Sequence, residues 1–453
     1  MKVTFNLDYI RKITDAKVSN VNSDILVKPW QGISTDSRTL KKGQIFLALR
    51  GEKFDGHQFL SDAINLSASA LIIDYDYDGE IEDIANVSIL RVKNTLLAYQ
   101  KIAQAWRQQF NIPVIGITGS VGKTSTKELI SAVLNTQGRV LKTTANFNNE
   151  IGVPKTLLEI DESHDFAVIE MAMRARGEIA LLTEIADPTV AIITNVGTAH
   201  IGLLGSREAI AEAKCELLAN LRPDGVAILN GDNALLMKTA GMVWQGKTVT
   251  YGLENGDLKG QIVENDKIEV NGQIYPLPLQ GDHHALNYLS ALGVVQVLGL
   301  DEKPLRDGVE VVLPKGRARS INVGNDIILL DETYNAGFES MIASLKLLKQ
   351  TKGARHLAVL GTMKELGDFA PQLHYQVGEM VRELNLDLLL ILADEPATEK
   401  MAEGAVGINT EIYQNHNQLL ARLQQEMRAG DRILFKASNS VGLGRIVEQL
   451  ITS

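Results

Sequence analysis

The stretch Ile115-Gly-Ile-Thr-Gly-Ser-Val-Gly-Lys-Thr-Ser125 decides the fold of the region around it. An apolar run over 114–117 predicts a buried strand before the glycines, and residues 129–134 carry helical spacing after them. This order suits a nucleoside triphosphate, because glycines let backbone N–H groups approach phosphates and a helix N-terminus favours negative charge. We expect Lys123 to reach the β- and γ-phosphates and the Thr124 hydroxyl to hold Mg²⁺.

The spacing of this loop departs from the common P-loop. Four residues should separate the first glycine from Gly122, but Gly119 leaves two and Gly116 leaves five. A glycine-rich turn without a phosphate role is the alternative, and the strand–loop–helix context argues against it. The sequence therefore predicts a protein that binds ATP or GTP.

The composition indicates a globular chain of several domains. Its 453 residues are enough for two to four domains, 45% of them are hydrophobic, and the net charge is −10. No basic stretch is long enough for a nucleic-acid groove, and no apolar run reaches transmembrane length. The N-terminus lacks a signal-peptide core, and the one cysteine, Cys215, excludes an internal disulfide. We expect a cytoplasmic protein without nucleic-acid partner or membrane span.

The pattern of strands and helices divides the chain into three regions. Before the glycine loop, strands are expected at 44–49 and 70–74, and a helix at 96–110. After it, strands alternate with helices, which predicts a mostly parallel sheet with strands at 166–170, 189–194, 226–229 and 248–251. Residues 259–279 alternate with period two around an Asn271-Gly272 turn and predict a hairpin.

A third region begins near Pro314 and reads as a second α/β unit without a glycine loop of its own. Its expected strands are 327–331, 356–360, 387–392 and 432–435.

Polar residues follow the predicted strands of the central region, where α/β sheets place their ligands. Glu170 ends an apolar strand and is well placed for Mg²⁺, with capping of a neighbouring loop as the alternative. His200 lies in the loop after the next strand, and Lys214 lies on the helix that follows. Taken alone, an exposed loop histidine and a surface lysine are the plainer interpretations.

Taken together, these residues resemble the Mur ligase family, the ATP-dependent amide-forming enzymes of peptidoglycan precursor assembly. The resemblance covers nearly the whole chain in order, and its shortened glycine loop accounts for the unusual spacing. It rests on the segments Thr118–Thr124, Thr144–Pro154, Glu170–Ile179, Thr194–His200, Gly281–Asn287, Lys315–Arg317 and Asp331–Asn335.

The resemblance implies an α/β fold of three domains. A small N-terminal α/β uridine-binding domain would span residues 1–95, and a central P-loop ATPase domain with a parallel sheet would span 96–314. A C-terminal Rossmann-like α/β domain, 315–453, would close on ATP and bind an incoming dipeptide.

The resemblance also implies the cofactors, ATP and Mg²⁺, and the residues that hold them. Lys123, Glu170, His200 and Lys214 would be catalytic, and Thr124, Glu170, His200 and a carbamylated Lys214 would be metal ligands. The ATP-binding set would be Thr118, Gly119, Ser120, Val121, Gly122, Lys123, Thr124, Ser125, Asn287, Arg317, Asp331 and Tyr334.

The substrate implied is a UDP-N-acetylmuramoyl peptide. It would be held by Ser37, Arg38, Lys53, Phe54, Thr144, Asn146 and Asn149. The segments Asn148–Pro154 and Asp331–Asn335 favour the branch of the family that joins D-alanyl-D-alanine to the tripeptide through an acyl phosphate, as a monomer.

Two other functions stay open at this point. The neighbouring branch adds a diamino acid to the dipeptide, but its Asp-Asn-Pro-Arg segment is absent here. A P-loop switch that binds nucleotide without ligation is the alternative from another class. Several positions also depart from the expected branch, including Gly337-Phe338 in place of Asn-Pro and Thr362 in place of aspartate. We therefore assign no residue to the D-alanyl-D-alanine pocket.

Overall fold

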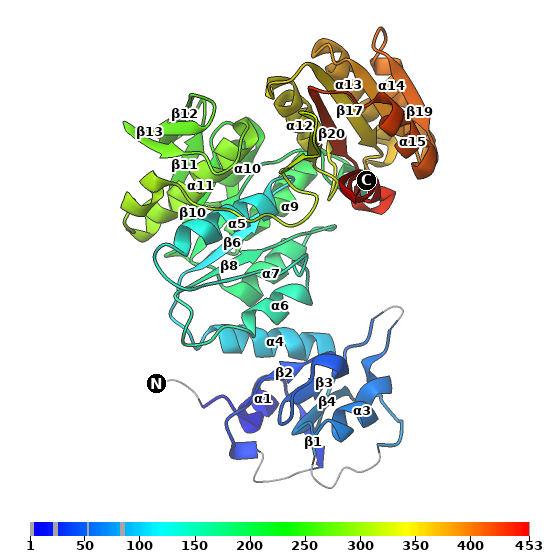
Figure 1. Ribbon diagram of the computed structural model, residues 1–453. Helices are drawn as coiled ribbons and strands as arrows, with labels where there is room; N and C mark the ends of the chain where they lie inside the picture. The colour runs from blue at the N-terminus through cyan, green and yellow to red at the C-terminus, as the bar shows by residue number, and fades with distance from the viewer. Residues whose placement is uncertain (1–3, 21–25, 52–53, 82–86, 453) are drawn as a thin grey trace.

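The computed structural model describes residues 4–20, 26–51, 54–81 and 87–452. Within these ranges the chain forms three β-sheets in sequence order, each covered by helices (Figure 1). We call the parts built on them the first, central and third units. The first unit lies at one end of the molecule, and the third unit lies against the central one.

The first unit is built on a sheet of strand order β1-β5-β4-β3-β2. Only β1 runs antiparallel to its neighbour. The sequence pattern predicted β3 and β4 and missed the other three strands. The elements are α1 (Leu7–Ile13), β1 (Lys17–Asn20), β2 (Ile33–Ser34), β3 (Ile45–Leu47), α3 (Leu60–Asn65), β4 (Ala70–Asp74) and β5 (Ser88–Val92).

The central sheet has the order β14-β13-β12-β11-β10-β9-β6-β8-β7, and its strands from β7 to β11 are all parallel. β6 lies between β8 and β9, so the carboxyl ends of these three strands meet at one edge. The strands are β6 (Val114–Thr118), β7 (Val140–Lys142), β8 (Phe166–Glu170), β9 (Val190–Ile193), β10 (Val226–Asn230), β11 (Lys247–Gly252), β12 (Leu258–Val263), β13 (Lys267–Val270) and β14 (Gln273–Pro276).

The end of this sheet corrects the predicted hairpin over 259–279. β12, β13 and β14 form an antiparallel meander, and the Asn271-Gly272 turn joins only the last two strands. The residues 264–266 supply a second turn, in which Glu264 and Asn265 adopt φ of +54° and +61°. No Asn-Gly pair marks that turn, which is why the pattern did not reveal it.

Helices cover both faces of the central sheet. One face is covered by α5 (Lys123–Leu134) and α11 (Asp282–Leu298), whose apolar side chains form one core with the sheet. The other is covered by α7 (Glu178–Ala186), α9 (Arg207–Ala219) and α10 (Ala234–Val243). Cys215 is buried on α9. Two shorter helices are α6 (Gly152–Leu157) and α8 (Ile201–Leu204).

The third unit has a sheet of order β15-β16-β20-β17-β18-β19, in which only β15 and β16 are antiparallel. The edge strands β15 and β19 were not predicted. Its elements are β15 (Arg319–Asn322), β16 (Ile328–Asp331), α12 (Phe338–Gln350), β17 (Arg355–Gly361), α13 (Ala370–Glu383), β18 (Leu388–Leu392), α14 (Lys400–Gly404), β19 (Thr410–Tyr413), α15 (His416–Glu426), β20 (Asp431–Lys436) and α16 (Gly444–Thr452).

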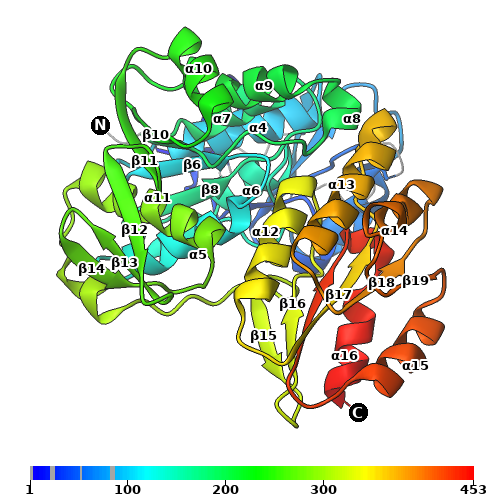
Figure 2. The same cartoon turned by 90° about the horizontal axis from the view of Figure 1, so that it is seen from above.

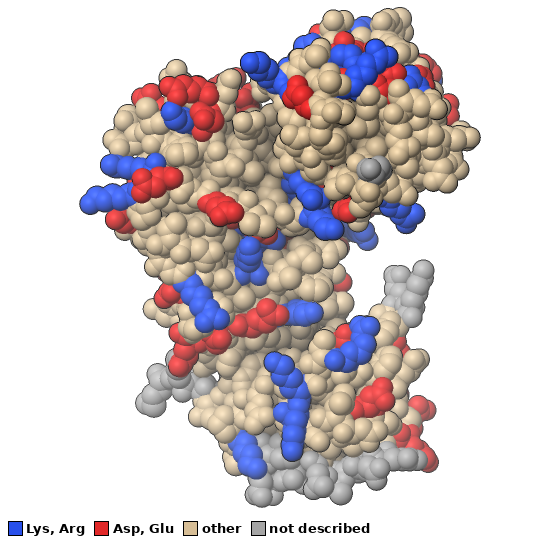
Figure 3. Space-filling view, in the orientation of Figure 1, with Lys and Arg blue, Asp and Glu red and all other residues tan. Residues whose placement is uncertain are grey.

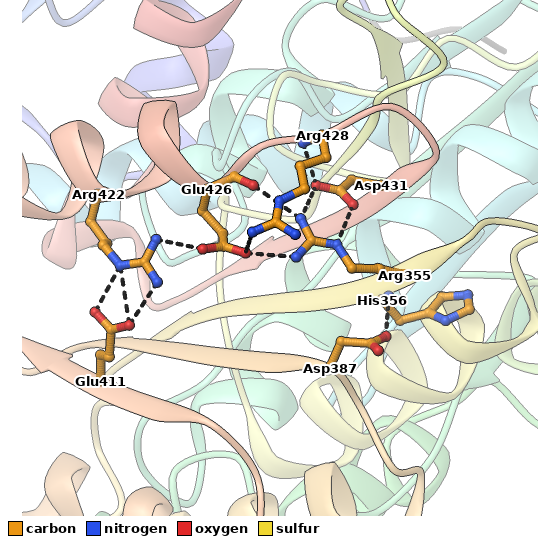
Figure 4. Close-up of polar contacts among 8 residues, drawn as sticks. All are labelled: Arg355, His356, Asp387, Glu411, Arg422, Glu426, Arg428 and Asp431. Carbon is orange, nitrogen blue, oxygen red and sulfur yellow. Dashed lines mark hydrogen bonds and ion pairs between the residues drawn. The ribbon is translucent and has the colours of Figure 1, made fainter.

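An ion-pair network ties α15 to the sheet of the third unit (Figure 4). Arg355 contacts Glu426 at 2.6 Å and Asp431 at 2.8 Å, and Arg422 links Glu426 to Glu411. Hydrogen bonds from Arg355 and Arg422 lower the pKa of Glu426 below its ordinary value. Asp431 is fully buried, so this network fastens the amino end of β20 to the helix before it.

Two features join the units. The helix α4 (Thr95–Arg107) contributes side chains to the core of the first unit and lies against α6 and α7 of the central one (Figure 1). At the other junction, one apolar cluster runs from Val196 and Ile201 of the central unit to Met341 and Leu366 of the third. Seen from above, α12 and α13 face the central helices (Figure 2). Among the described residues, no helix combines the length and apolar character needed to cross a membrane.

Candidate active site

The glycine loop connects β6 to α5 at the carboxyl edge of the central sheet. Gly119 and Gly122 adopt φ of +154° and +84°, and a Cβ on Gly119 would lie 1.9 Å from Oγ1 of Thr194. Both positions therefore require glycine. Lys123 begins α5 and donates from Nζ to the carbonyl of Gly119 at 2.8 Å, while the Thr124 side chain is buried beside it.

The loop after β9 holds the glycine loop in place. The amide of Asn195 accepts from Val121 N–H at 3.1 Å and donates to the Val121 carbonyl at 3.0 Å. Thr194 donates to the same carbonyl at 2.7 Å, and Gly197 N–H donates to Ser120 Oγ at 2.9 Å. Protein groups thus hold the glycine loop through four hydrogen bonds.

Glu170 ends β8 next to this loop. Its Oε1 accepts from Asn148 Nδ2 at 2.8 Å, and its backbone N–H donates to Thr143 Oγ1 at 3.0 Å. Its Oε2 is buried and accepts no hydrogen bond from any described residue. A buried carboxylate oxygen without a donor is costly, so it has the character of a ligand for a cation.

A buried lysine on α5 lies behind Glu170. Lys127 donates from Nζ to the Thr143 carbonyl at 2.7 Å, pairs with Glu128 at 3.1 Å and lies 3.8 Å from Oε2 of Glu170. Lys142, which is partly exposed, completes the cluster through an ion pair with Glu128. These ion pairs connect α5 to Glu170, the last residue of β8.

His200 and Lys214 lie near the same edge. His200 adopts φ of +66° just before α8, and its Nδ1 lies 2.6 Å from Oε2 of Glu365 in the third unit. Burial lowers the pKa of His200, and the charge of Lys123 lowers it further, while Glu365 opposes both. Burial and Lys123 likewise hold the pKa of Lys214 well below its ordinary value. The charge of Lys214 also lowers the pKa of His200.

The third unit brings a second group of predicted ATP residues to the central one. Arg317 stacks on the ring of Tyr334, with its guanidinium carbon 3.9 Å from the ring centroid, and its Nε has no partner among the described residues. Asp331, at the end of β16, is buried and accepts from the Thr333 hydroxyl at 2.6 Å. Burial lowers the pKa of Lys123, the charge of Glu170 opposes this effect, and the charge of Arg317 adds to it.

Asn287 on α11 lies against the glycine loop. A Cβ on Gly122 would be 2.9 Å from Oδ1 of Asn287, so the side chain packs on the turn that precedes Lys123. One turn earlier, His284 is buried with neither ring nitrogen hydrogen-bonded to any described residue, and its ring lies 4.0 Å from that of His283. The start of α11 therefore presents polar groups beside the loop.

The predicted substrate residues lie on exposed surface. Arg38 pairs with Asp36 at 2.7 Å, Ser37 lies between them in the chain, and Phe54 is 52% exposed against Phe59. Lys53 lies outside the described residues.

Thr144, Asn146 and Asn149 are exposed in the segment before α6. Asn149 accepts from Gly152 N–H at 2.9 Å, which orders the start of that helix. The hydrogen bond from Arg38 lowers the pKa of Asp36, and the charge of Lys155 on α6 adds a smaller effect in the same direction.

The molecule is hollowed between the first and third units on the face that Figure 3 shows. Lys and Arg side chains line the margin of the third unit above this hollow (Figure 3). Such a margin suits an anionic substrate despite the net negative charge of the chain.

The side chains at this edge of the sheet supply only part of the ligand set that Mg²⁺ needs. No group of three or more His, Cys, Asp or Glu side chains that could hold a metal occurs in the described parts of the chain. Glu170 and His200 would supply two such ligands, and Oε2 of Glu170, which accepts no hydrogen bond from any described residue, already lies 3.8 Å from the Lys127 ammonium. The remaining ligands would come from Thr124, a modified Lys214 and phosphate oxygens, so the donor set fits the ion only together with these.

Sequence reasoning missed several residues that the structure brings to the site. Asn148 and Asn195 lie within segments that carry the family resemblance, but the sequence assigned neither of them a role at the site. Lys127 lies one helical turn beyond Lys123 and offered a spacing signal, but Glu339 and Glu365 of the third unit offered none. Their roles depend on packing between units, which no local pattern encodes.

The central unit carries a P-loop at the carboxyl edge of its sheet, and the third α/β unit lies against it. This arrangement defines a nucleotide-dependent enzyme of three domains. The family models give the class a name. Residues 29–108 match the Mur ligase family catalytic domain, 117–295 the Mur ligase middle domain, and 316–439 the Mur ligase glutamate ligase domain. The chain belongs to the Mur ligase family and is an ATP-dependent ligase.

Individual relatives agree with this placement. A UDP-N-acetylmuramoyl-tripeptide–D-alanyl-D-alanine ligase from Synechocystis is 57% identical over 96% of this chain and 94% of its own length. The crystal structure of MurF from Acinetobacter baumannii has a TM-score of 0.88 at 29% identity over 99% of both chains. MurF from Thermotoga maritima, solved with ADP, has a TM-score of 0.81 at 28% identity over 93% of this chain and 97% of its own. The predicted α/β class with three domains is confirmed.

Proposed function

We propose that this chain joins D-alanyl-D-alanine to UDP-N-acetylmuramoyl-tripeptide, with conversion of ATP to ADP and phosphate. The observation that carries the proposal is the 57% identity over 96% of the chain to a ligase of that name. The arrangement of Lys123, Glu170 and His200 at one sheet edge supports it, because a nucleotide switch would not need that group.

Activation of the substrate carboxylate explains the need for ATP. A carboxylate is a poor acyl donor because oxide would have to leave. Transfer of the γ-phosphoryl group to a carboxylate oxygen gives an acyl phosphate, from which phosphate leaves when the amine of the dipeptide attacks. Lys123, fixed at the start of α5, would neutralise charge on the phosphates during the transfer.

The residues that would hold Mg²⁺ are Thr124, Glu170, His200 and Lys214, and the bound ion would supply charge neutralisation on the phosphates. Lys214 would act as a carbamate. Its neutral amine attacks CO₂ and loses a proton, which replaces a cation by an anion. The lowered pKa of this buried lysine supports the step, because the neutral amine is the reactive form.

The substrates would occupy both sides of the hollow between the units. Ser37, Arg38, Lys53 and Phe54 would hold the UDP group, and Thr144, Asn146 and Asn149 the muramoyl peptide. Asn287, Arg317, Asp331 and Tyr334 would bind the adenosine and phosphates of ATP. The domain limits would be 1–95, 96–314 and 315–453, and the enzyme would work as a cytoplasmic monomer.

The test is phosphate release from ATP in the presence of UDP-N-acetylmuramoyl-tripeptide, with D-alanyl-D-alanine or an L-diamino acid as the amine. We expect release only with the tripeptide and the D-dipeptide together. Release with the UDP-muramoyl dipeptide and a diamino acid would instead support the neighbouring branch. Mg²⁺ removal by a chelator is expected to stop release, and a carbamate on Lys214 would add the mass of CO₂ to that side chain.

A further inference from the structure

The first unit contains a buried histidine three residues after Phe54. This residue, His57, lies in the short helix η2 (Gly56–Phe59), and its ring stacks on that of Tyr77 with 4.7 Å between the centroids. A buried imidazole is costly unless its nitrogens have hydrogen-bond partners. Both nitrogens of His57 have a partner, so these two contacts indicate what the ring does.

The hydrogen bonds of His57 assign the proton to one ring nitrogen. Nε2 lies 3.1 Å from the backbone nitrogen of Asp74, whose N–H can only donate, so Nε2 is the acceptor. The proton of the neutral ring is therefore on Nδ1, which donates to Oδ1 of Asp55 at 2.6 Å. Burial raises the pKa of Asp55, but hydrogen bonds from the backbone and ring of His57 hold it below its ordinary value. Asp55 is thus an ionised acceptor for the ring.

The two partners of the ring hold different parts of the first unit. Asp74 ends β4, and its Oδ1 accepts from the backbone N–H of Thr95, the first residue of α4, at 3.0 Å. Asp55 directly follows Phe54 in the chain, and its Oδ1 also accepts from the backbone N–H of His57 at 3.0 Å. The ring of His57 therefore connects the segment that carries Phe54 to the end of the sheet and to the start of α4.

The backbone of this segment is held closely, whereas the Phe54 side chain is exposed. Gly56 N–H donates to the Leu49 carbonyl at 2.7 Å, and a Cβ on Gly56 would lie 2.8 Å from that oxygen. The Phe54 ring stacks on Phe59 with 5.6 Å between the centroids and an angle of 19° between the planes. An exposed ring that is already oriented loses little freedom when a planar base packs against it.

We propose that His57 is a positioning residue for the UDP substrate, which holds Asp55 and thereby keeps the exposed ring of Phe54 in the orientation that binds the nucleoside. The inference rests on the proposed role of Phe54 in holding the UDP group. It extends that role to a buried residue that acts through Asp55, with Asp74 as its anchor in the sheet.

The test measures the dissociation constant of UDP-N-acetylmuramoyl-tripeptide by calorimetry, with ADP in the nucleotide site so that no turnover occurs. Two variants separate the two hydrogen bonds of the ring. The amide of His57→Gln replaces Nε2 as acceptor for Asp74 N–H but leaves Asp55 without the ring donor. The amide nitrogen of His57→Asn replaces Nδ1 as donor to Asp55 but leaves Asp74 N–H without its acceptor.

We expect the dissociation constant to rise about fivefold in His57→Gln, which is the usual effect of one lost hydrogen bond. In His57→Asn, which keeps the donor to Asp55, the rise should be less than about twofold. An equal rise in both variants would overturn the proposal, because the bond to Asp55 would then have no special part in substrate binding.

A double-variant cycle tests whether His57 acts through Phe54. In the Phe54→Ala background, His57→Gln should change the dissociation constant by less than about twofold, because the ring that His57 positions has been removed. Two full effects that multiply in the double variant would contradict the proposal.

Thr14→Val is the control for a general loss of stability. Thr14 is buried, and its hydroxyl donates to the Ile10 carbonyl at 2.7 Å within another element of the first unit. This variant should keep the dissociation constant within about twofold of wild type, while the melting temperature reports its stability. A rise as large as that in His57→Gln would overturn the proposal in favour of a loosened first unit.

Should His57→Gln fail to fold, Asp55→Ala removes the same link from its partly exposed side and should weaken binding about fivefold. Unchanged binding in whichever of these two variants folds would overturn the proposal. A wild-type protein that does not bind the UDP substrate would overturn it as well. Because calorimetry needs no turnover, these results stay separate from a failure of the proposed ligation, which phosphate release reports.

Discussion

The glycine loop and the exposed loops of the first unit are both predicted binding sites, but they differ in how their residues are held. Val121 alone makes three hydrogen bonds with the loop after β9, one as donor and two as acceptor, and the buried Lys127 pairs with Glu128 on α5. Arg38 pairs with a neighbour two residues away, and Phe54 has half its surface in solvent.

The difference teaches where the geometry of each site comes from. Phosphates and a metal ion demand fixed donors, because phosphoryl transfer is largely a matter of positioning and charge. A nucleoside base can instead be held by exposed aromatic and charged side chains that adjust when it binds. Substitutions in the two regions should therefore affect different quantities.

Loss of the Lys123 charge should give the largest effect. In Lys123→Met we expect phosphate release to fall about 1,000-fold, because Lys123 begins α5, where we propose that the phosphates bind. Steady-state phosphate release measures the loss of activity, and the melting temperature shows whether the variant still folds. A fall of less than tenfold would mean that Lys123 does not contact the phosphates.

Removal of the buried Lys127 charge should chiefly reduce stability. Lys127→Met leaves Glu128 with a weakened set of partners in a buried position, and breaking such a pair costs about 3 kcal/mol. Urea unfolding measures the change. Lys142→Met, which removes a partly exposed partner of the same Glu128, is the matched control and should cost less than about 1 kcal/mol.

Asn195→Ala removes both amide hydrogen bonds to Val121. At about 1 kcal/mol for each bond, the freed glycine loop should bind ADP roughly 10- to 30-fold more weakly. Calorimetric titration with ADP measures the affinity. Unchanged affinity would show that the ligand orders the loop by itself and would remove the contrast with the first unit.

Phe54→Ala should act on substrate binding alone. We expect the KM for the UDP substrate to rise about tenfold with kcat unchanged, and stability to change by less than about 0.5 kcal/mol. Leu66→Ala, at another exposed apolar residue of the first unit, is the control and should leave KM unaltered. A drop in kcat instead would place Phe54 closer to the chemistry than we propose.

The smallest effect concerns the pH dependence of the exposed Arg38–Asp36 pair. The hydrogen bond from Arg38 lowers the pKa of Asp36 below 3.8, so the stabilisation is full above that pH and is lost as the pH falls through the folded-state pKa. Because the Arg38 side chain is 86% exposed, Arg38→Ala should change the free energy of unfolding by less than about 0.5 kcal/mol near neutral pH. Urea unfolding at neutral and acidic pH measures the difference, and a loss that persists in acid would refute the pair as its source.

Much of the fold was predictable because periodicity and turn residues act locally. The apolar runs predicted the inner strands of the central sheet, where both faces are buried. They missed the edge strands β1, β15 and β19, whose side chains are exposed or half-buried and form no apolar run, and they also missed the buried strand β5. The meander at 258–276 was predicted only around its Asn-Gly turn.

The sequence by itself determined the glycine loop, the alternation of strands and helices along the central region, and the family, because glycine positions and apolar runs are properties of contiguous residues. Only the tertiary structure decided which distant residues complete the site. Asn195 meets Val121, and Glu365 meets His200, through the packing of layers and units. Such contacts join positions far apart in the chain, and their free energy depends on burial and docking that no local pattern records.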